Sequence, residues 1–333
     1  MRGRMKFLSL PVLAALPAGA ATVFAFAPFG LWPLQILALA LLFLLVQRAP
    51  SAKAAFMTGW AFGTASIAAG TYWLYVSMHD YGGMPAPMAA VAVLLLAAGL
   101  GLLYGLATGL ARRIAGALPA PPVLMLLLPA CWTLADWTRN WIFTGFPWVA
   151  TGYAHNASPL AGYAPLVGVF GVGFLASVIA GCIATMLQLR RLHRVALALL
   201  ILVPVAGIAL SQLRWTAPHG QAITVRLLQG NVPQEMKFDA AQLDASLQLY
   251  RAMITEKRAD LIATPETALP LLATYLPHGY LEQLASFAKG QDSKLLVGIP
   301  WTTAPGIYLN SVIGIGDDNA YRYDKHHRVP FGE

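Results

Sequence analysis

The stretch that decides the fold class is residues 86–111, which read APMAAVAVLLLAAGLGLLYGLATGLA and contain no charged side chain. A helix needs about 20 largely apolar residues to cross a membrane, so this stretch is long enough. Six other largely apolar runs lie at residues 7–27, 31–47, 54–76, 121–142, 164–188 and 195–213. The sequence therefore predicts a membrane domain of about seven transmembrane helices over residues 1–213.

The composition supports a membrane protein and separates the chain into two parts. Of the 333 residues, 58% are hydrophobic and 11% are charged, whereas soluble domains have about 25% charged residues. Residues 1–213 contain 11 Lys and Arg but only two acids, Asp80 and Asp136, while residues 214–333 contain 11 basic residues and 12 acids. The net charge of +8 therefore belongs to the apolar part, and we expect no nucleic-acid partner.

The positions of the basic residues predict an orientation, because Lys and Arg concentrate in cytoplasmic loops. Ten of the 11 basic residues before position 214 fall at one end of the predicted helices, and Arg139 falls at the other. We therefore expect a bacterial inner-membrane protein with a cytoplasmic N-terminus and with residues 214–333 in the periplasm. Two acids are too few for an ion pathway, which argues against a transporter. Asp136 and Arg139 are candidates for an ion pair near the membrane surface.

The potential ligands for metals do not form a recognisable site. Cys131 and Cys182 lie in apolar runs and are expected to be small buried side chains, without disulfide or zinc spacing. His326 and His327 have no third ligand at metal spacing. We expect neither a metal nor a cofactor.

The second part of the chain has the pattern of an α/β domain. Alternating or continuous apolar residues predict strands, and apolar residues three and four apart predict amphipathic helices. A hairpin turn is expected at residues 316–319. The predicted order is strand 222–229, helix 240–257, strand 260–264, helix 279–289, and strands 294–301, 309–315 and 321–323. This order is typical of a sheet covered by helices.

Two charged residues follow the ends of predicted strands, where α/β folds collect reactive groups. Glu266 follows the strand at 260–264, and Lys325 follows the strand at 321–323. A carboxylate can act as a general base and an ammonium can stabilise an oxyanion, so the two together suit acyl transfer. Each residue alone is more often a surface side chain, so the hypothesis depends on their convergence.

Three motifs, in order, resemble those of the apolipoprotein N-acyltransferase family, the membrane branch of the nitrilase superfamily. They are QGNVPQ at 229–234, PETA at 265–268 and YDKHHRVPFGE at 323–333, and GFPW at 145–148 matches in the membrane part. The resemblance covers essentially the whole chain. It implies that residues 214–333 are the N-terminal part of a nitrilase-like α-β-β-α sandwich.

The resemblance also implies a reaction with a Glu-Lys-Cys triad. In that reaction Glu266 is the general base, Lys325 stabilises the oxyanion, and Glu333 is a supporting acid. A cysteine takes an acyl chain from a phospholipid and passes the chain to the N-terminal amine of a diacylglyceryl apolipoprotein. The implied partners are therefore a phospholipid donor, an apolipoprotein acceptor and the lipid bilayer.

Aromatic residues are the candidate substrate contacts. Phe238 and Thr264 stand where the family often has Trp, so an aromatic ring is kept only at Phe238. Phe146 and Trp148 are candidates for docking the lipid substrates, although aromatic residues at this depth also serve as interfacial anchors.

The family's nucleophilic Cys lies beyond the Phe-Gly-Glu motif that ends at Glu333. Neither Cys131 nor Cys182 is expected to replace it, so these 333 residues are expected to be inactive alone. A membrane-anchored nitrilase-type amidase and a non-catalytic scaffold or remnant stay open as alternatives. A long apolar entry to Glu266 and Lys325 would favour a lipid substrate, and a closed polar pocket would favour a small amide.

Overall fold

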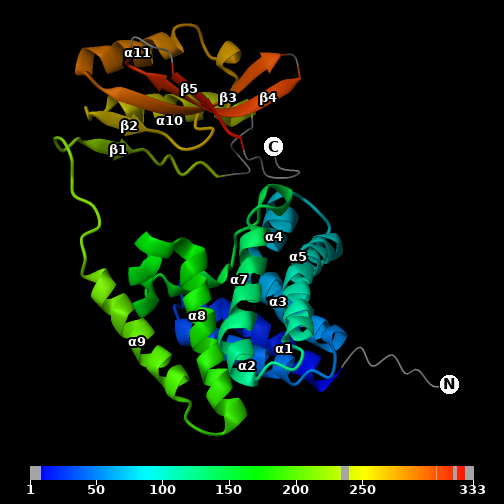
Figure 1. Ribbon diagram of the computed structural model, residues 1–333. Coiled ribbons are helices and arrows are strands. Elements are labelled where there is room, and N and C mark those ends of the chain that lie inside the picture. The colour runs from blue at the N-terminus through cyan, green and yellow to red at the C-terminus, as the bar shows by residue number, and fades with distance from the viewer. Residues whose placement is uncertain (1–8, 234–239, 305, 318–320, 327–333) are drawn as a thin grey trace. The chain divides into compact units, whose positions relative to one another are not determined.

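A computed structural model describes residues 9–233, 240–304, 306–317 and 321–326 of the chain. The chain divides into two compact units, Met1–Ala217 and Pro218–Glu333, which are described separately. The first unit is helical, and the second contains a mixed sheet with helices (Figure 1).

Each of the seven apolar runs of the first unit overlaps at least one helix. In the described part of the chain, four helical segments are long and apolar enough to cross a membrane: Ala86–Ala115, Ala120–Arg139, Pro159–Leu189 and Arg194–Ser211. Leu10–Ala25 and Trp32–Gln47 are shorter apolar segments. The helices are α1 (Leu10–Ala21), α2 (Trp32–Gln47), α3 (Ala52–Gly70), α4 (Trp73–Val76), α5 (Ala86–Ala115), α6 (Ala120–Pro122), α7 (Leu128–Arg139), α8 (Ala164–Leu189) and α9 (Arg194–Ser211). The four long segments confirm a membrane helical region, while the full number of crossings stays a prediction.

Helices α3 and α5 pack closely because small residues line their interface, as is common between membrane helices. A Cβ atom at Gly59 would lie 2.0 Å from Oγ1 of Thr108, so only glycine fits there. The Thr108 hydroxyl donates a hydrogen bond of 3.0 Å to the carbonyl of Ala55. This bond joins the two helices across the interface.

An ion pair between Asp136 and Arg139 lies inside the first unit. Oδ1 of Asp136 is 3.4 Å from Nη2 of Arg139, and the two side chains are 4% and 0% exposed. The Tyr104 hydroxyl also donates to Oδ1 of Asp136. The pairing is as expected, and the pair is buried in the protein, where Tyr104 of α5 supplies a third polar partner.

The long connection after α7 is ordered by this pair. It contains three 3₁₀ helices, at Ile142–Thr144, Thr151–His155 and Pro159–Tyr163. Arg139 Nη1 donates to the carbonyl of Trp148 at 2.5 Å. The backbone N–H of Thr151 donates to Oδ2 of Asp136 at 2.9 Å. The connection is thus anchored at two points to the end of α7.

The second unit has the predicted order of elements, β-α-β-α-β-β-β. The elements are β1 (Val225–Leu227), α10 (Ala240–Thr255), β2 (Leu261–Ala263), α11 (Tyr280–Gln291), β3 (Lys294–Ala304), β4 (Ile307–Ile315) and β5 (Tyr321–Asp324). The sheet order is β1-β2-β3-β4-β5. Strands β1, β2 and β3 are parallel, and β3, β4 and β5 are antiparallel.

The start of β1 is fixed to the start of β2 by a side chain. Asp260 accepts hydrogen bonds from the backbone N–H of Thr224 at 2.6 Å and from its hydroxyl at 2.8 Å. These bonds, with a smaller contribution from Arg258, lower the pKa of the Asp260 carboxyl below its usual value.

The two faces of the sheet differ. Helices α10 and α11 cover one face and form a core with it; its buried members include Leu247, Tyr250, Ile254, Leu284, Ala288, Ile262, Leu295, Val297, Ile299 and Ile313. A row across the other face joins Leu227, Ala263, Leu296, Gly314 and Tyr321. At the ends of this row, Leu227 is 80% exposed and Tyr321 is 56% exposed. Apolar side chains therefore stand uncovered on one face within the described residues.

Candidate active site

The turn that carries Glu266 is fixed to strand β3. It follows β2, and the N–H of Thr264 donates to the carbonyl of Leu296 at 2.9 Å. The Thr264 hydroxyl accepts a hydrogen bond of 3.0 Å from the N–H of Gly298, and the N–H of Leu269 donates to the Gly298 carbonyl at 3.1 Å. Three bonds therefore hold the turn on both sides of Glu266.

Gly298 is the residue that lets this turn approach β3. A Cβ atom there would lie 2.2 Å from the carbonyl oxygen of Pro265 and 2.8 Å from the nitrogen of Thr267. Both are backbone atoms, which cannot move aside as a flexible side chain can. Thr267 has a φ of 50°, a conformation that costs free energy for a β-branched residue. The strained backbone conformation of Thr267 is therefore part of the geometry that positions the turn.

Strand pairing brings Lys325 to Glu266 although 59 residues separate them in the sequence. Beyond the end of β5, the N–H of Lys325 donates to the carbonyl of Asn310 on β4 at 2.9 Å. Nζ of Lys325 then donates to Oε1 of Glu266 at 3.0 Å. The two residues that were predicted to converge at strand ends are therefore in direct contact.

Asn310 is a site residue that the sequence reasoning missed. Its Nδ2 donates to the same Oε1 of Glu266, and its Oδ1 lies 3.5 Å from the hydroxyl of Thr267. A signal was available, because Asn310 and Ser311 are the two polar residues of the otherwise apolar strand at 309–315. Glu266 thus accepts from one ammonium and one amide group that are supplied by two neighbouring strands.

The ion pair is open to solvent. The side chain of Lys325 is 31% exposed and that of Glu266 is 57% exposed. An exposed pair of this kind contributes little to stability. A carboxylate with access from solvent can accept a proton, and an adjacent ammonium can donate a hydrogen bond to a developing negative charge. The arrangement is chemically suited to acid–base work.

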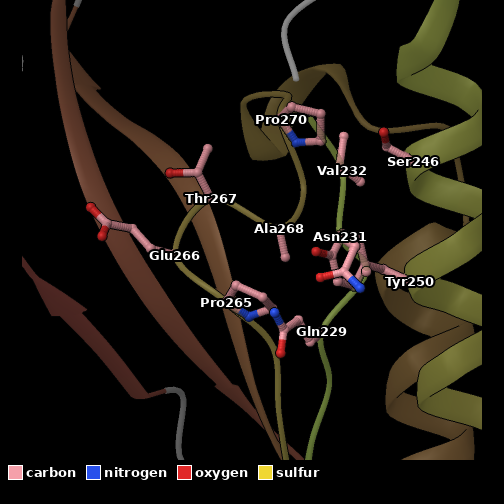
Figure 2. Close-up of a pocket in the computed structure, with 11 residues that line it drawn as sticks. Gln229, Asn231, Val232, Ser246, Tyr250, Pro265, Glu266, Thr267, Ala268 and Pro270 are labelled. Atoms are coloured by element: carbon pink, nitrogen blue, oxygen red, sulfur yellow. The ribbon is translucent and has the colours of Figure 1, made fainter. Parts of the chain in front are cut away.

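A cavity of about 250 Å³ lies on the other side of the Glu266 turn. It is enclosed by the segment after β1, the turn itself and α10. Figure 2 shows that the Glu266 carboxylate points away from Ser246 and Tyr250 on α10. The cavity is lined by Gln229, Gly230, Asn231, Val232, Ser246, Tyr250, Pro265, Glu266, Thr267, Ala268 and Pro270.

The remaining predicted residues fall in other places. Phe146 and Trp148 belong to the first unit, where their ring centroids are 5.1 Å apart, and Trp148 is 47% exposed. Trp73 adds a third ring, 5.8 Å from Trp148. Phe238 and Glu333 lie outside the described residues.

Two further groups of candidate ligands are placed by the structure. Cys131 and Cys182 lie in α7 and α8 of the first unit, and Cys182 is fully buried. His326 packs edge-on against Tyr323 with ring centroids 6.1 Å apart, whereas His327 lies outside the described residues. Within the described ranges, no group of three or more His, Cys, Asp or Glu side chains is placed to hold a metal ion.

Comparisons with known proteins agree with the motifs. The family described as apolipoprotein N-acyltransferase N-terminal domain matches residues 18–182. A Ralstonia nicotianae protein named apolipoprotein N-acyltransferase is 45% identical over 99% of this chain and 63% of its own length. Proteins of the same name from Chromobacterium violaceum and Nitrosomonas europaea are 44% and 40% identical, over 99% and 97% of this chain.

The chain spans about 63–65% of the length of these curated relatives. The matched region includes the membrane helices and the unit that carries Glu266 and Lys325, because nearly all of the chain is aligned. Identities of 40–45% over such lengths, together with the match to the N-terminal domain, lead to one assignment. The chain belongs to the apolipoprotein N-acyltransferase family.

Proposed function

We propose that the full-length protein transfers an acyl chain from a phospholipid to the N-terminal amine of a diacylglyceryl-cysteine apolipoprotein. The observation that carries the proposal is the contact of 3.0 Å between Nζ of Lys325 and Oε1 of Glu266. The names of the relatives support the general reaction class. The specific donor and acceptor come from the resemblance of the motifs.

In the proposed mechanism Glu266 is the general base for a cysteine nucleophile. A free thiol has a pKa of about 8.5 and is only a few per cent thiolate at neutral pH, so an adjacent base raises its reactivity. The thiolate attacks the ester carbonyl of the phospholipid, the ester C–O bond breaks, and the lysophospholipid leaves with the proton that Glu266 accepted. The products are an acyl thioester and a lysophospholipid.

The second half of the reaction uses the same groups. The acceptor amine attacks the thioester, the C–S bond breaks, and the thiol is restored as an amide forms. In both halves Lys325 donates a hydrogen bond to the tetrahedral oxyanion, and such donors typically contribute 10²–10³ to the rate, by order of magnitude. Glu333 is proposed as a supporting acid. The nucleophile is assigned to neither Cys131 nor Cys182, because each belongs to a helix of the first unit.

The second unit is proposed to be part of a nitrilase-like α-β-β-α sandwich. The asymmetry of its sheet supports this proposal, since α10 and α11 cover one face while Leu227 and Tyr321 are exposed on the other. In a sandwich of two sheets, the uncovered apolar face packs against the second sheet. Solution of the structure of the full-length protein tests this assignment directly.

The proposed location is the bacterial inner membrane, with the N-terminus in the cytoplasm and the second unit in the periplasm. The distribution of Lys and Arg supports this orientation. A cysteine introduced at Gly220 is a usable reporter, because the position is exposed and a Cβ atom added there would have no other atom within 4 Å, although the φ of 77° adds local strain. Labelling of that cysteine by an impermeant reagent from the periplasmic side is expected, and labelling only from the cytoplasmic side would overturn the orientation.

The catalytic proposal is tested with Glu266→Gln and Lys325→Ala in the full-length protein. After incubation with phospholipid, mass spectrometry should show at least about a 100-fold loss of acyl-thioester adduct in each variant. Glu256→Gln is the matched control, because Glu256 also forms an exposed ion pair, at 2.9 Å from Arg226, but lies away from the turn. An unchanged amount of acyl-thioester adduct in both site variants would contradict the catalytic roles of Glu266 and Lys325. Hydrolysis of small amides without any acyl adduct would favour the amidase alternative.

A further inference from the structure

Among the described residues, seven basic side chains gather at one end of the first unit, and we name this set the basic cluster. They come from three separate parts of the chain: the turn between α2 and α3, the last turn of α5, and the turn between α8 and α9. The members are Arg48, Lys53, Arg112, Arg113, Arg190, Arg191 and Arg194. None of them takes part in the site around Glu266.

Two hydrogen bonds show that these three parts lie together. Nε of Arg48, which directly follows α2, donates to Oε1 of Gln188 at 2.9 Å, and Gln188 is in the last turn of α8. Nε of Arg112 donates to the carbonyl of Ala49 at 3.0 Å, which joins the end of α5 to the turn between α2 and α3. In Figure 1, the turn between α8 and α9 lies at the lower end of α8 and α9. The cluster is therefore one surface.

No carboxylate of the described residues compensates the charge of this surface. Arg112 is half-buried and the other six cations are exposed. The first 213 residues contain only two acids, of which Asp136 is buried with Arg139. Asp80 precedes α5, whereas Arg112 is in its last turn, which separates them by about 40 Å along the helix at roughly 1.5 Å per residue. In the part of the chain that the structure describes, none of the seven forms an ion pair with a carboxylate.

Helix dipoles account for only some of these cations. Arg112 and Arg113 lie in the last turn of α5, where a positive charge is favourable. Arg194, in contrast, is the first residue of α9, where the dipole disfavours a cation. Arg191 lies in the turn between the helices. The helix dipoles therefore favour Arg190, which directly follows α8, but they do not explain Arg194.

The position of the basic cluster at the ends of long apolar helices indicates which layer of the membrane it meets. Arg190 directly follows α8 and Arg194 begins α9, and both helices belong to segments that are long and apolar enough to cross a membrane. Cations at the end of such a helix lie at the level of the lipid headgroups. Guanidinium groups bind phosphate through two parallel hydrogen bonds, which suits them to that layer.

We propose that the basic cluster binds the headgroups of anionic phospholipids in the leaflet that meets this end of the first unit. The bound lipids hold the helix ends together at the membrane surface by neutralising seven cations that have no carboxylate partner in the described structure. Basic groups between helix ends are known to recognise anionic headgroups in this way. The proposal rests on the membrane insertion of the first unit and does not depend on the proposed catalytic reaction.

The test measures lipid selectivity of the purified full-length protein in vesicles of phosphatidylcholine that contain a small fraction of spin-labelled lipid. Spin-labelled phosphatidylglycerol is expected to associate several-fold more strongly than spin-labelled phosphatidylcholine. In the triple variant Arg190→Gln, Arg191→Gln and Arg194→Gln, this several-fold preference should fall to nearly equal association of the two lipids. Arg48 and Arg112 are kept, because their hydrogen bonds join the helices.

The control variant removes the same charge outside the cluster, with Arg214→Gln, Lys257→Gln and Lys289→Gln; these three side chains are exposed. It should keep the preference of the unmodified protein. A second measurement needs no variant: raising the salt concentration should weaken the preference, because headgroup binding by exposed cations is screened. Equal preference in the cluster and control variants, or a preference that salt does not change, would overturn the proposal. Loss of the preference for phosphatidylglycerol when inorganic phosphate is added at millimolar concentration would also overturn the proposal. That result would show that the cluster is a site for free anions.

Discussion

Two ion pairs of this molecule, each between a carboxylate and a basic side chain, lie in opposite environments. In the first unit, Asp136 and Arg139 are 3.4 Å apart and almost fully buried. In the second unit, Glu266 and Lys325 are 3.0 Å apart and partly exposed. The shorter distance belongs to the pair with more access to water, so distance alone does not show which pair matters for stability.

The surroundings of the two pairs differ as much as their exposure. The buried pair is completed by Tyr104, by the N–H of Thr151 and by the carbonyl of Trp148, and it fixes the connection that carries the aromatic residues. The exposed pair is held in place by a strained turn and by Asn310, while solvent reaches both charges. A buried pair is costly to break, whereas an exposed pair can exchange partners at little cost, as the proposed catalytic role of Glu266 and Lys325 requires.

The largest effect on stability is expected from Arg139→Met. This change leaves the Asp136 carboxylate buried without its cation, and breaking a buried pair from one side costs about 3–5 kcal/mol. Thermal unfolding of the purified protein in detergent measures the loss. The double variant Asp136→Asn with Arg139→Met should recover part of it, because no unpaired charge is left. A loss below about 1 kcal/mol in the single variant would show that the pair is not structurally important.

A smaller effect is expected from Gly298→Ala, which tests how the exposed pair is positioned. The added methyl group would meet the backbone of the Glu266 turn, and overpacking of this kind costs about 1–3 kcal/mol. Gly290→Ala in α11 is the matched control, because a Cβ atom added at that position would have no other atom within 4 Å; it should stabilise by about 0.5–1 kcal/mol. Equal unfolding temperatures for the two variants would contradict the close approach at Gly298.

The smallest effect on stability is expected from Lys325→Met. The pair with Glu266 is exposed to solvent, so its removal should change the free energy of unfolding by no more than about 1 kcal/mol. Denaturant unfolding of the full-length protein measures this change. The same variant should lose acyl-adduct formation, so activity and stability separate. A loss of several kcal/mol would mean that the pair is structural, and the comparison with Asp136 and Arg139 would fail.

The secondary structure was predictable because its signals are local. The apolar run at 86–111 became α5, and the order of strands and helices after residue 217 is as predicted. The ends of the elements were less accurate: the strand expected at 222–229 is β1 at Val225–Leu227. Periodicity of apolar residues marks the existence of an element, but hydrogen bonds to other strands decide where it ends.

The candidate site was predictable only in part. Glu266 and Lys325 were identified because each follows a predicted strand and lies in a motif. Asn310 was missed because strand register decides which residue of β4 lies beside Lys325. The ion pair of Asp136 and Arg139 could be suggested from a spacing of three residues, but its burial depends on Tyr104, which is distant in the sequence.

The sequence by itself determined the membrane class, the order of the elements, the family motifs and the charged residues of the candidate site. These features follow from composition and local periodicity, which depend on neighbours along the chain. Only the tertiary structure decided which ion pair is buried and which is exposed, that Gly298 admits the Glu266 turn, and that seven cations share one surface. These features depend on contacts between residues that are distant in the sequence, because burial and pairing are set by packing and strand register rather than by local pattern.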